Sequence, residues 1–150
     1  MSVEENREIA RIPYEAFNDR DFERVSSIVA PGAKVTNILT GETFEGPAGF
    51  RQYLQTWASA FPDARLEITN IVAGEHGAAV EFTGRGTNSG PLMTPIGEIP
   101  PTGRRGEQRF CDMYRITGGK IAGVQTYFDL MSLLTYFDVA GLMRQLRLTP

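Results

Sequence analysis

The chain has 150 residues, a length that fits one domain spanning 1–150. Its formal net charge of −3 argues against the basic surface that nucleic-acid-binding proteins use, so we expect no nucleic-acid partner. One cysteine rules out an internal disulfide, and no apolar run approaches the roughly 18 residues of a membrane span. With a polar, acidic N-terminus unlike a signal peptide, the sequence favours a cytoplasmic protein with no membrane partner.

The first third of the chain is predicted to be mostly helical. The first helix rests on apolar residues at helical spacing, namely Ile9, Ile12, Ala16 and Phe17. Pro13 lies inside this pattern and lacks an N–H donor, so it predicts a kink or a late helix start. Asp21 is typical of an N-cap for a short second helix, which Pro31-Gly32 should end.

A weak alternation over residues 33–38 predicts the first strand, and Gly46-Pro47 opens a third helix that stops at Pro62. The apolar stripe of this helix consists of Phe50, Leu54, Trp57 and Phe61.

Most of the remaining chain is predicted to be strand. The expected strands cover 66–72, 78–88, 107–117 and 121–128, with turns at 74–77 and at Gly118-Gly119. A last helix should follow with Leu130, Leu133, Leu134 and Phe137, and residues 141–146 either extend it or cover a neighbouring subunit. Helices followed by meandering strands favour an α+β domain with the helices on one sheet face.

A loop of about 17 residues, Gly90 to Gly106, separates two of the long strands. It is rich in proline and glycine, and we expect it to have no secondary structure of its own. Loops of this length are usually functional, so it is interpreted either as a lid over a pocket or as an arm at an interface.

Asp112 is the leading candidate for catalysis. Strand alternation places it on one face with Phe110, Tyr114 and Ile116. A carboxylate among aromatic side chains is desolvated, which raises its pKa and suits acid–base work. The alternative is a partly solvated face, or an ion pair with Arg109 or Arg115.

Asp129 is a second catalytic candidate, because it ends the last strand where it can reach a pocket. Its position before a predicted helix favours the role of an N-cap. Tyr14 and Asn37 are candidates for hydrogen bonds to a substrate. Further substrate-binding candidates are Trp57, Phe82, Phe110, Tyr114 and Thr126, of which the aromatic ones are core residues first and ligand contacts second.

Metal and triad chemistry find little support. The only histidine, His76, lies in a glycine-flanked turn, and with one cysteine it cannot form the usual zinc site or a well-placed Ser-His-Asp triad. We expect no metal and no cofactor.

Several segments resemble the SnoaL-like polyketide cyclases of the nuclear transport factor 2-like superfamily. The most specific runs from Ile99 to Arg105 (IPPTGRR), and weaker ones are 15–18 (EAFN), 61–63 (FPD), 113–116 (MYRI) and 119–121 (GKI). The resemblance implies a cone-shaped, curved antiparallel sheet that is covered by N-terminal helices and encloses an apolar pocket. It also implies a homodimer, a hydrophobic small-molecule ligand and cofactor-free acid–base chemistry.

The sequence departs from the aldol cyclases of this family at two positions. Their acid–base aspartate falls at Thr126, which cannot take up a proton at neutral pH, and a cavity histidine falls at Asp112. Either the carboxylate has moved across the cavity or the aldol chemistry is absent. The Asp-Arg-Asp constellation of the related limonene epoxide hydrolases is not matched, since Glu81, Thr83 and Thr126 stand in its place.

Three functions remain open. The first is a cyclase or isomerase that acts on a hydrophobic, ring-bearing carbonyl compound, with Asp112 as general base or acid. The second is a non-catalytic module that binds an apolar metabolite. The third is an interaction protein whose open sheet face mainly forms a dimer, and this one predicts a filled or tiny cavity.

Overall fold

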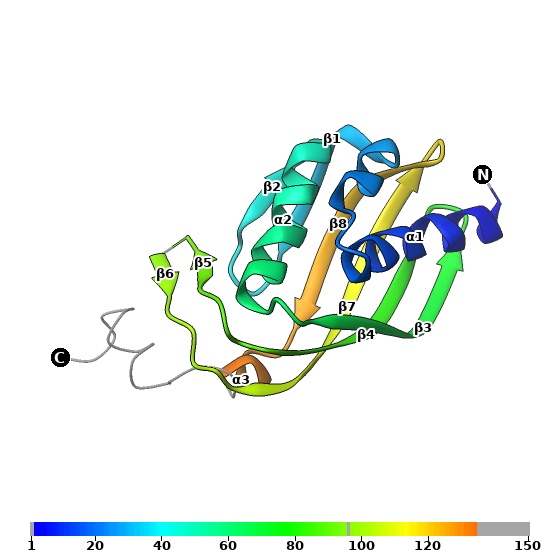
Figure 1. Ribbon diagram of the computed structural model, residues 1–150. Helices are drawn as coiled ribbons and strands as arrows, with labels where there is room; N and C mark the ends of the chain where they lie inside the picture. The colour runs from blue at the N-terminus through cyan, green and yellow to red at the C-terminus, as the bar shows by residue number, and fades with distance from the viewer. Residues whose placement is uncertain (1, 96, 135–150) are drawn as a thin grey trace.

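The computed structural model describes residues 2–95 and 97–134 (Figure 1). Its helices are α1 (Val3–Asn18), the 3-10 helix η1 (Phe22–Ser27), α2 (Gly46–Ala60) and α3 (Leu130–Leu133). Its strands are β1 (Val29–Asn37), β2 (Thr43–Glu45), β3 (Arg65–Gly74), β4 (Gly77–Thr87), β5 (Leu92–Thr94), β6 (Gly97–Ile99), β7 (Arg105–Thr117) and β8 (Lys120–Phe128).

Six strands form one curved sheet in the order β2-β1-β8-β7-β4-β3, and β5 pairs with β6 in a separate hairpin. Neighbouring strands of the sheet are antiparallel except β1 and β8, which are parallel. The expectation of a purely antiparallel sheet is corrected at this one pair. The chain crosses the sheet through α2 before it enters the meander β3-β4-β7-β8, so the last strand of the meander runs in the same direction as β1.

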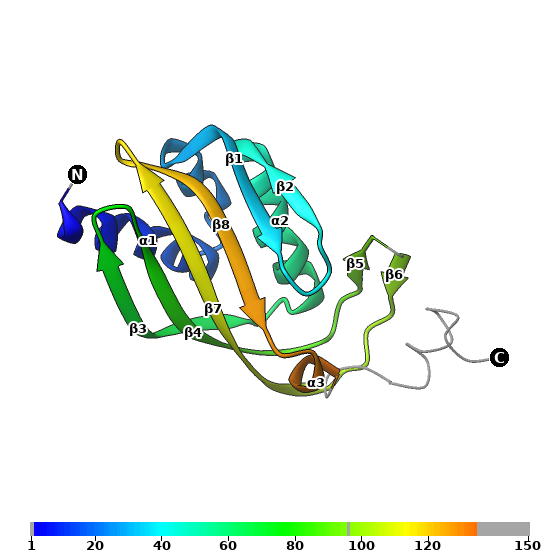
Figure 2. The same ribbon diagram turned by 180° about the vertical axis from the view of Figure 1, so that it is seen from behind.

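The helices α1 and α2 lie on one face of the sheet, and Figure 2 shows the opposite face without a described helix over it. This arrangement confirms the α+β class. The buried apolar side chains gather between the helices and the sheet, among them Phe17, Val35, Phe50, Leu54 and Phe82. None of the described helices is both long and apolar enough to cross a membrane.

The helix α1 starts earlier than its proline suggested. Ser2 and Glu5 form a reciprocal capping box, in which each side chain accepts a hydrogen bond from the backbone of the other. The helix then continues through Pro13, so the expected late start is wrong. The capping box supplies partners for end groups that would otherwise be unpaired, which favours a start at Val3.

The strand β1 begins at Val29, so Pro31-Gly32 lies inside a strand and does not end a helix there. The strand tolerates this pair because its register against β8 shifts between Val29 and Lys34. Pro31 also meets the start of α2. Gly46 has a φ of +72°, and a Cβ at this position would lie 2.9 Å from the carbonyl oxygen of Pro31, so glycine is required.

The hairpin between β7 and β8 forms as predicted. Gly118 and Gly119 have φ angles of 57° and 79°, the positive values that a two-residue turn of this type needs. The turn fixes a register in which Asp112 stands opposite Thr126, and Tyr114 opposite Val124.

The segment between β4 and β7 has secondary structure of its own, contrary to expectation, because β5 and β6 form a short hairpin. We call residues 89–103 the arm. Asn88, which is fully buried, closes the base of the arm. Its side chain donates to the carbonyls of Ala60 and Gly90 and accepts from the backbone N–H and the hydroxyl of Thr102. The arm is therefore anchored to the end of α2.

The last described helix, α3, covers Leu130–Leu133, as predicted for its start. The predicted continuation through Phe137 and over 141–146 lies outside the described residues.

Candidate functional site

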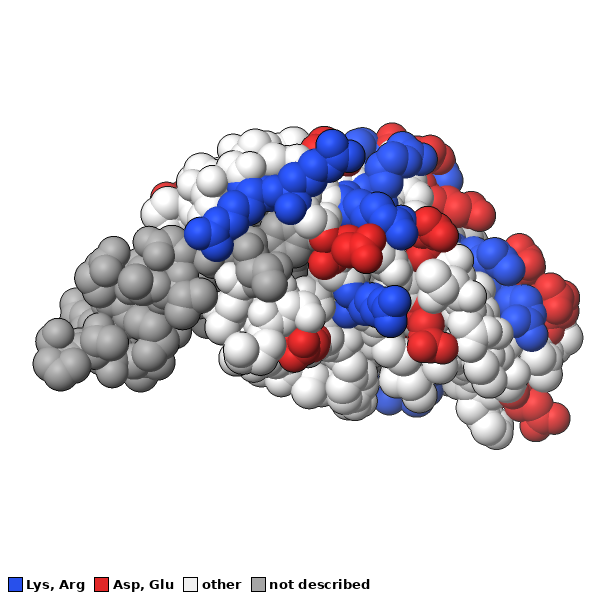
Figure 3. Space-filling model, turned by 90° about the horizontal axis from the view of Figure 1, so that it is seen from below, with Lys and Arg blue, Asp and Glu red and all other residues white. Residues whose placement is uncertain are grey.

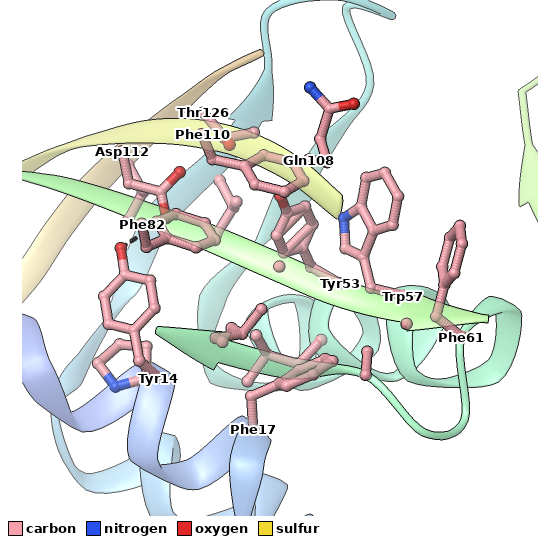
Figure 4. Close-up of a pocket in the computed structure, with 18 of the residues that line it drawn as sticks. Tyr14, Phe17, Tyr53, Trp57, Phe61, Phe82, Gln108, Phe110, Asp112 and Thr126 are labelled. Atoms are coloured by element: carbon pink, nitrogen blue, oxygen red, sulfur yellow. Dashed lines mark hydrogen bonds between the residues drawn. The ribbon is translucent and has the colours of Figure 1, made fainter. Parts of the chain in front are cut away.

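A cavity of about 80 Å³ lies between the sheet and the helices. Its walls come from α1, α2, β1, β3, β4, β7 and β8, with Leu133 of α3. Most of the lining is apolar and much of it aromatic, including Phe17, Phe50, Leu54, Trp57, Phe61, Phe82 and Phe110 (Figure 4). Such a lining suits an apolar ligand.

Asp112 contributes a carboxylate to this lining. The side chains of Phe110, Asp112 and Tyr114 alternate along β7 on the cavity face, as the pattern predicted. Asp112 is only 7% exposed, and within the described residues it has no salt-bridge partner. The alternative of an ion pair with a neighbouring arginine on β7 is therefore not realised.

A chain of hydroxyl groups leads to this carboxylate. The hydroxyl of Tyr114 donates to that of Tyr14 over 2.8 Å, and Tyr14 donates to Oδ2 of Asp112 over 2.7 Å (Figure 4). Both tyrosine side chains are buried, and burial raises the pKa of each well above its ordinary value. The two hydroxyls therefore stay protonated and act as hydrogen-bond donors.

Burial raises the pKa of Asp112 to about 6, while the nearby hydroxyls of Thr126, Tyr14 and Tyr114 act in the opposite direction. Desolvation is the larger effect, because it penalises the charged form throughout an apolar cavity. A carboxyl group with this pKa exchanges protons close to neutral pH.

Two polar atoms at this end of the cavity have no hydrogen-bond partner among the described residues. They are Oδ1 of Asp112 and Oγ1 of Thr126, whose residues face each other across β7 and β8. Buried polar groups are normally paired, and a ligand with a polar group at this end of the cavity would supply a partner.

The position of Tyr14 depends on how α1 is anchored. One turn later, Asn18 exchanges two hydrogen bonds with the backbone of Leu66 at the start of β3, one of 2.8 Å and one of 2.7 Å. This contact fixes the end of α1 against the sheet. The ring of Tyr14 then packs on Phe82 with 4.7 Å between centroids.

The aromatic candidates form one connected cluster. Phe82 and Phe110 are cross-strand neighbours whose rings stack at 4.9 Å between centroids. Trp57 packs edge-on against Phe110 and stacks on Phe61. Trp57, Phe82, Phe110, Tyr114 and Thr126 all line the cavity, which is where the sequence placed them.

Two predicted site residues lie elsewhere. Oδ1 of Asn37 accepts from the backbone N–H groups of Leu39 and Thr40, so its side chain shapes the turn after β1 and is not part of the cavity lining. Asp129 is exposed and caps α3 by accepting from Met131 and Ser132. Hydrogen bonds lower the pKa of Asp129, and the bond from the Ser132 hydroxyl has the largest effect. Asp129 is therefore an N-cap and not an acid–base group in the cavity.

Sequence reasoning missed two polar residues of the cavity. Tyr53 lies on α2, three residues after Phe50 and four before Trp57, and this spacing on the apolar stripe was the signal for it. Burial and the charge of Asp112 raise its pKa.

The second missed residue, Gln108, precedes Phe110 on the cavity face of β7 and is 5% exposed. Its Nε2 donates to the carbonyls of Arg109 and Asp129 over 3.2 and 3.4 Å. Its Oε1 has no partner in the described part of the chain. Alternation from Asp112 would have placed it on the cavity face.

No cluster of three or more histidine, cysteine, aspartate or glutamate side chains suited to a metal ion occurs within residues 2–95 and 97–134. His76 is exposed in its turn, and Cys111 lies on the alternate face of β7 from Asp112.

Comparison with known proteins identifies the same family as the sequence motifs. The SnoaL-like domain family matches residues 11–124. IdmH of Streptomyces antibioticus, a proposed polyketide cyclase, has 27% identity and a TM-score of 0.72, with 87% of this chain and 96% of IdmH covered. No curated protein matches the chain with significant similarity.

Two further structures share the fold. A proposed SnoaL-like polyketide cyclase of Jannaschia sp. CCS1 has 15% identity and a TM-score of 0.78, covering 89% of this chain and 91% of that one. AclR of Streptomyces galilaeus, a proposed hydroxylase, has 22% identity and a TM-score of 0.73, covering 89% and 96%.

Proposed function

The chain belongs to the SnoaL-like domain family, and on this premise we propose that it is a cyclase- or isomerase-type protein for a hydrophobic, ring-bearing carbonyl compound. Asp112 is the acid–base group in this proposal. Its ligand occupies the apolar cavity, and its chemistry needs no metal or redox cofactor. IdmH, described as a proposed polyketide cyclase, supports the reaction class.

The observation that carries the proposal is one buried carboxyl group in an aromatic cavity, with its pKa raised to about 6. General bases work best when their pKa is near the working pH, because both protonation states are then accessible. The hydrogen bond from the Tyr14 hydroxyl holds the group in one orientation. Tyr14 occupies Oδ2, which leaves Oδ1 for the substrate.

In the proposed step, Oδ1 of Asp112 takes a proton from the carbon next to the substrate carbonyl. The electron pair of the broken C–H bond moves to the carbonyl oxygen and forms an enolate. Hydroxyl donors nearby, Thr126 and Tyr53, stabilise the negative oxygen. The enolate then attacks a second carbonyl of the same molecule and the alkoxide formed takes the proton back from Asp112, or Asp112 returns the proton to a different carbon. The first course closes a ring and the second isomerises the substrate.

Tyr14 and Tyr114 are positioning residues in this scheme. Their hydrogen bonds run toward the carboxylate, so they stabilise its charged form and fix its rotamer. They remain protonated throughout the step.

The test uses 2-tetralone, a small ring-bearing ketone with acidic hydrogens next to its carbonyl. The protein should accelerate exchange of these hydrogens for deuterium in heavy water, measured by mass spectrometry. Asp112→Asn should reduce the acceleration by at least about 100-fold, the usual contribution of a positioned acid–base group. The matched variant Asp129→Asn changes an exposed cap and should exchange like the wild type. Equal exchange by the wild type and Asp112→Asn would remove the acid–base assignment.

Thr126 favours a second candidate function, a non-catalytic binding module. A threonine stands where the resemblance places the acid–base aspartate of the aldol cyclases, and threonine cannot take up the proton. This alternative predicts that 2-tetralone raises the melting temperature without any deuterium exchange. A pure interaction protein would have a filled or tiny cavity, and an aromatic cavity that contains a buried carboxylate supports a ligand-binding role instead.

We keep the homodimer as part of the proposal. The sheet face opposite the helices has exposed apolar side chains, including Val72 at 62%, Met113 at 47% and Tyr127 at 42% exposure. Burying such a face against a second copy would remove apolar surface from water. Analytical ultracentrifugation should give twice the chain mass, and Met113→Glu should lower the fraction of dimer. A monomer at all concentrations would contradict this part.

A further inference from the structure

The cavity has polar groups in two separate places along β7. Asp112, with its hydroxyl neighbours, marks one of them, and Gln108 marks the other. Figure 4 shows Phe110 between them, with Tyr14 on the side of Asp112 and Trp57 on the side of Gln108. The proposed acid–base step uses the first place and gives no role to the second.

The orientation of the Gln108 amide follows from its partners. Both groups in reach of Nε2 are carbonyl oxygens, those of Arg109 and Asp129, and these can only accept hydrogen bonds. The NH2 group must therefore point at them. A flip would place Oε1 against two carbonyl oxygens, so the amide is locked with Oε1 free to accept.

Oε1 is buried, and within the described residues no donor reaches it. A buried acceptor without a donor costs free energy, so this glutamine is poorly explained as a purely structural core residue. An apolar side chain of similar size would fill the space without that cost. Since Gln108 lines the cavity, a donor on a ligand is the group that would satisfy it.

We propose that Gln108 is a specificity-determining residue whose Oε1 accepts a hydrogen bond from a hydroxyl or N–H group of the ligand. The ligand is an elongated ring-bearing compound with a carbonyl at one end, near Asp112, and a donor at the opposite end, near Gln108. This inference rests on the proposed function, because the carbonyl end is assigned through Asp112.

The spacing along the strand sets the scale of the ligand. Gln108 and Asp112 are four residues apart on one face of β7, so their Cα atoms are separated by roughly 13 Å. Phe110 lies midway, with Phe82 stacked on it. The apolar body of the ligand therefore packs against these rings while its two polar ends reach different residues. A compound with a single polar group satisfies only one end.

The test compares two probes with one ring system, 2-tetralone and 6-hydroxy-2-tetralone. The second adds a hydroxyl on the ring remote from the carbonyl. Isothermal titration calorimetry gives a dissociation constant for each, and the ratio of the two constants is the readout. We expect the hydroxylated probe to bind the wild type about fivefold more tightly, as one neutral hydrogen bond allows. A site with an unsatisfied acceptor discriminates against the ligand that lacks the donor.

Gln108→Leu should bring the ratio close to one, because leucine fills the space without an acceptor. Gln108→Met is the second variant in case leucine impairs folding, and it should have the same effect. The matched control is Gln125→Leu, which changes an exposed glutamine on the other face of the sheet and should keep the fivefold ratio.

Equal binding of the two probes to the wild type, including no binding of either, would overturn the inference. So would a fivefold preference that persists in both Gln108 variants. Failure of the proposed function has a different signature, since deuterium exchange of 2-tetralone depends on Asp112 and is measured separately. A hydroxyl preference without exchange would retain Gln108 as a binding residue and remove the acid–base step.

Discussion

The hydroxyl of Tyr14, on the first helix, donates a hydrogen bond of 2.7 Å to Oδ2 of Asp112, on the seventh strand. The two residues are 98 positions apart in the sequence, and the bond lies inside the cavity. It joins the helical layer to the sheet at the one carboxylate that the proposed chemistry uses. The protonation of Asp112 therefore depends on how α1 packs.

Tyr14→Phe should raise the pKa of Asp112 further above 6, because the lost hydrogen bond favoured the charged form. The acidic limb of the exchange rate of 2-tetralone, where the rate falls as Asp112 becomes protonated, should move to higher pH. The measurement is a pH–rate profile. Tyr127→Phe is the matched control, since the hydroxyl of Tyr127 donates to the exposed Gln125 on the other face of the sheet and the profile should not move. A profile that is the same in Tyr14→Phe and the wild type would contradict the prediction.

Asp112→Asn should stabilise the protein increasingly as the pH rises. The pKa of Asp112 is about 6 in the folded chain against an ordinary value of 3.8, so between these values the folded chain holds a proton that the unfolded chain has lost. The stability of the wild type therefore falls as the pH rises from about 4 to about 6, by up to about 3 kcal/mol. Asparagine does not titrate, so the variant lacks this loss. Urea unfolding at several pH values measures the difference.

Asp129→Asn is the control with the opposite sign. The pKa of Asp129 is lowered by its hydrogen bonds in the cap, so its contribution to stability is present at neutral pH and is lost in acid. This variant should be less stable than the wild type at neutral pH, with the gap closing as the pH falls. If the stabilities of both variants changed with pH in the same direction relative to the wild type, the pKa values of the two carboxyl groups would not be shifted in opposite directions.

Phe82→Ala should destabilise the protein by about 3 to 5 kcal/mol, the usual cost of deleting a buried phenylalanine ring. The ring stacks on Phe110 and packs against Tyr14, so both contacts are lost together. Fluorescence of Trp57, the only tryptophan, reports the unfolding transition in urea. Val72→Ala removes an exposed side chain and should change stability by less than about 0.5 kcal/mol. Similar values for the two variants would argue against a packed aromatic cluster.

Asn88→Ala should loosen the arm more than the sheet. The substitution removes the donors to the carbonyls of Ala60 and Gly90 and the side-chain acceptor of the Thr102 amide, at a cost of about 2 kcal/mol or more. Hydrogen exchange at the amides of Thr102 and Gly103 should accelerate. Asn70→Ala, at an exposed asparagine of β3, is the control and should leave these amides protected. Unchanged protection in Asn88→Ala would show that other contacts hold the arm.

Much of the fold could be predicted because it follows from local patterns. Alternation along 107–117 placed Asp112 on a buried face with Phe110 and Tyr114, and Gly118-Gly119 marked the hairpin. The pairing of β1 with β8 and the strand through Pro31-Gly32 were not predictable in this way, because both depend on a partner far along the chain. The hairpin inside the arm was missed for a related reason, since proline and glycine dominate its local signal.

The residues of the candidate site could likewise be predicted where a local pattern places them, but not where a distant part of the chain does. Residues on the cavity face of β7 could be read from alternation, but the bond between Tyr14 and Asp112 depends on the packing angle of α1. Asn37 and Asp129 were candidates because they are polar residues at the ends of strands, and for Asp129 the N-cap role was the favoured alternative. Each side chain instead accepts hydrogen bonds from backbone N–H groups of the next few residues. Short polar side chains at strand ends often form such local bonds in place of contacts with a distant site.

The parallel pair β1 and β8 has a consequence for how the chain is made. Asn37 lies beside Thr126 in the folded sheet. During synthesis on the ribosome, β1 is therefore made well before β8, the strand with which it pairs. Until β8 has left the ribosome, one edge of β1 and the apolar stripe of α2 lack their final neighbours. A nascent chain of this protein therefore has an interval before β8 is made in which chaperones can bind it, and the carboxylate of Asp112 reaches its final environment only after β8 has paired with β7.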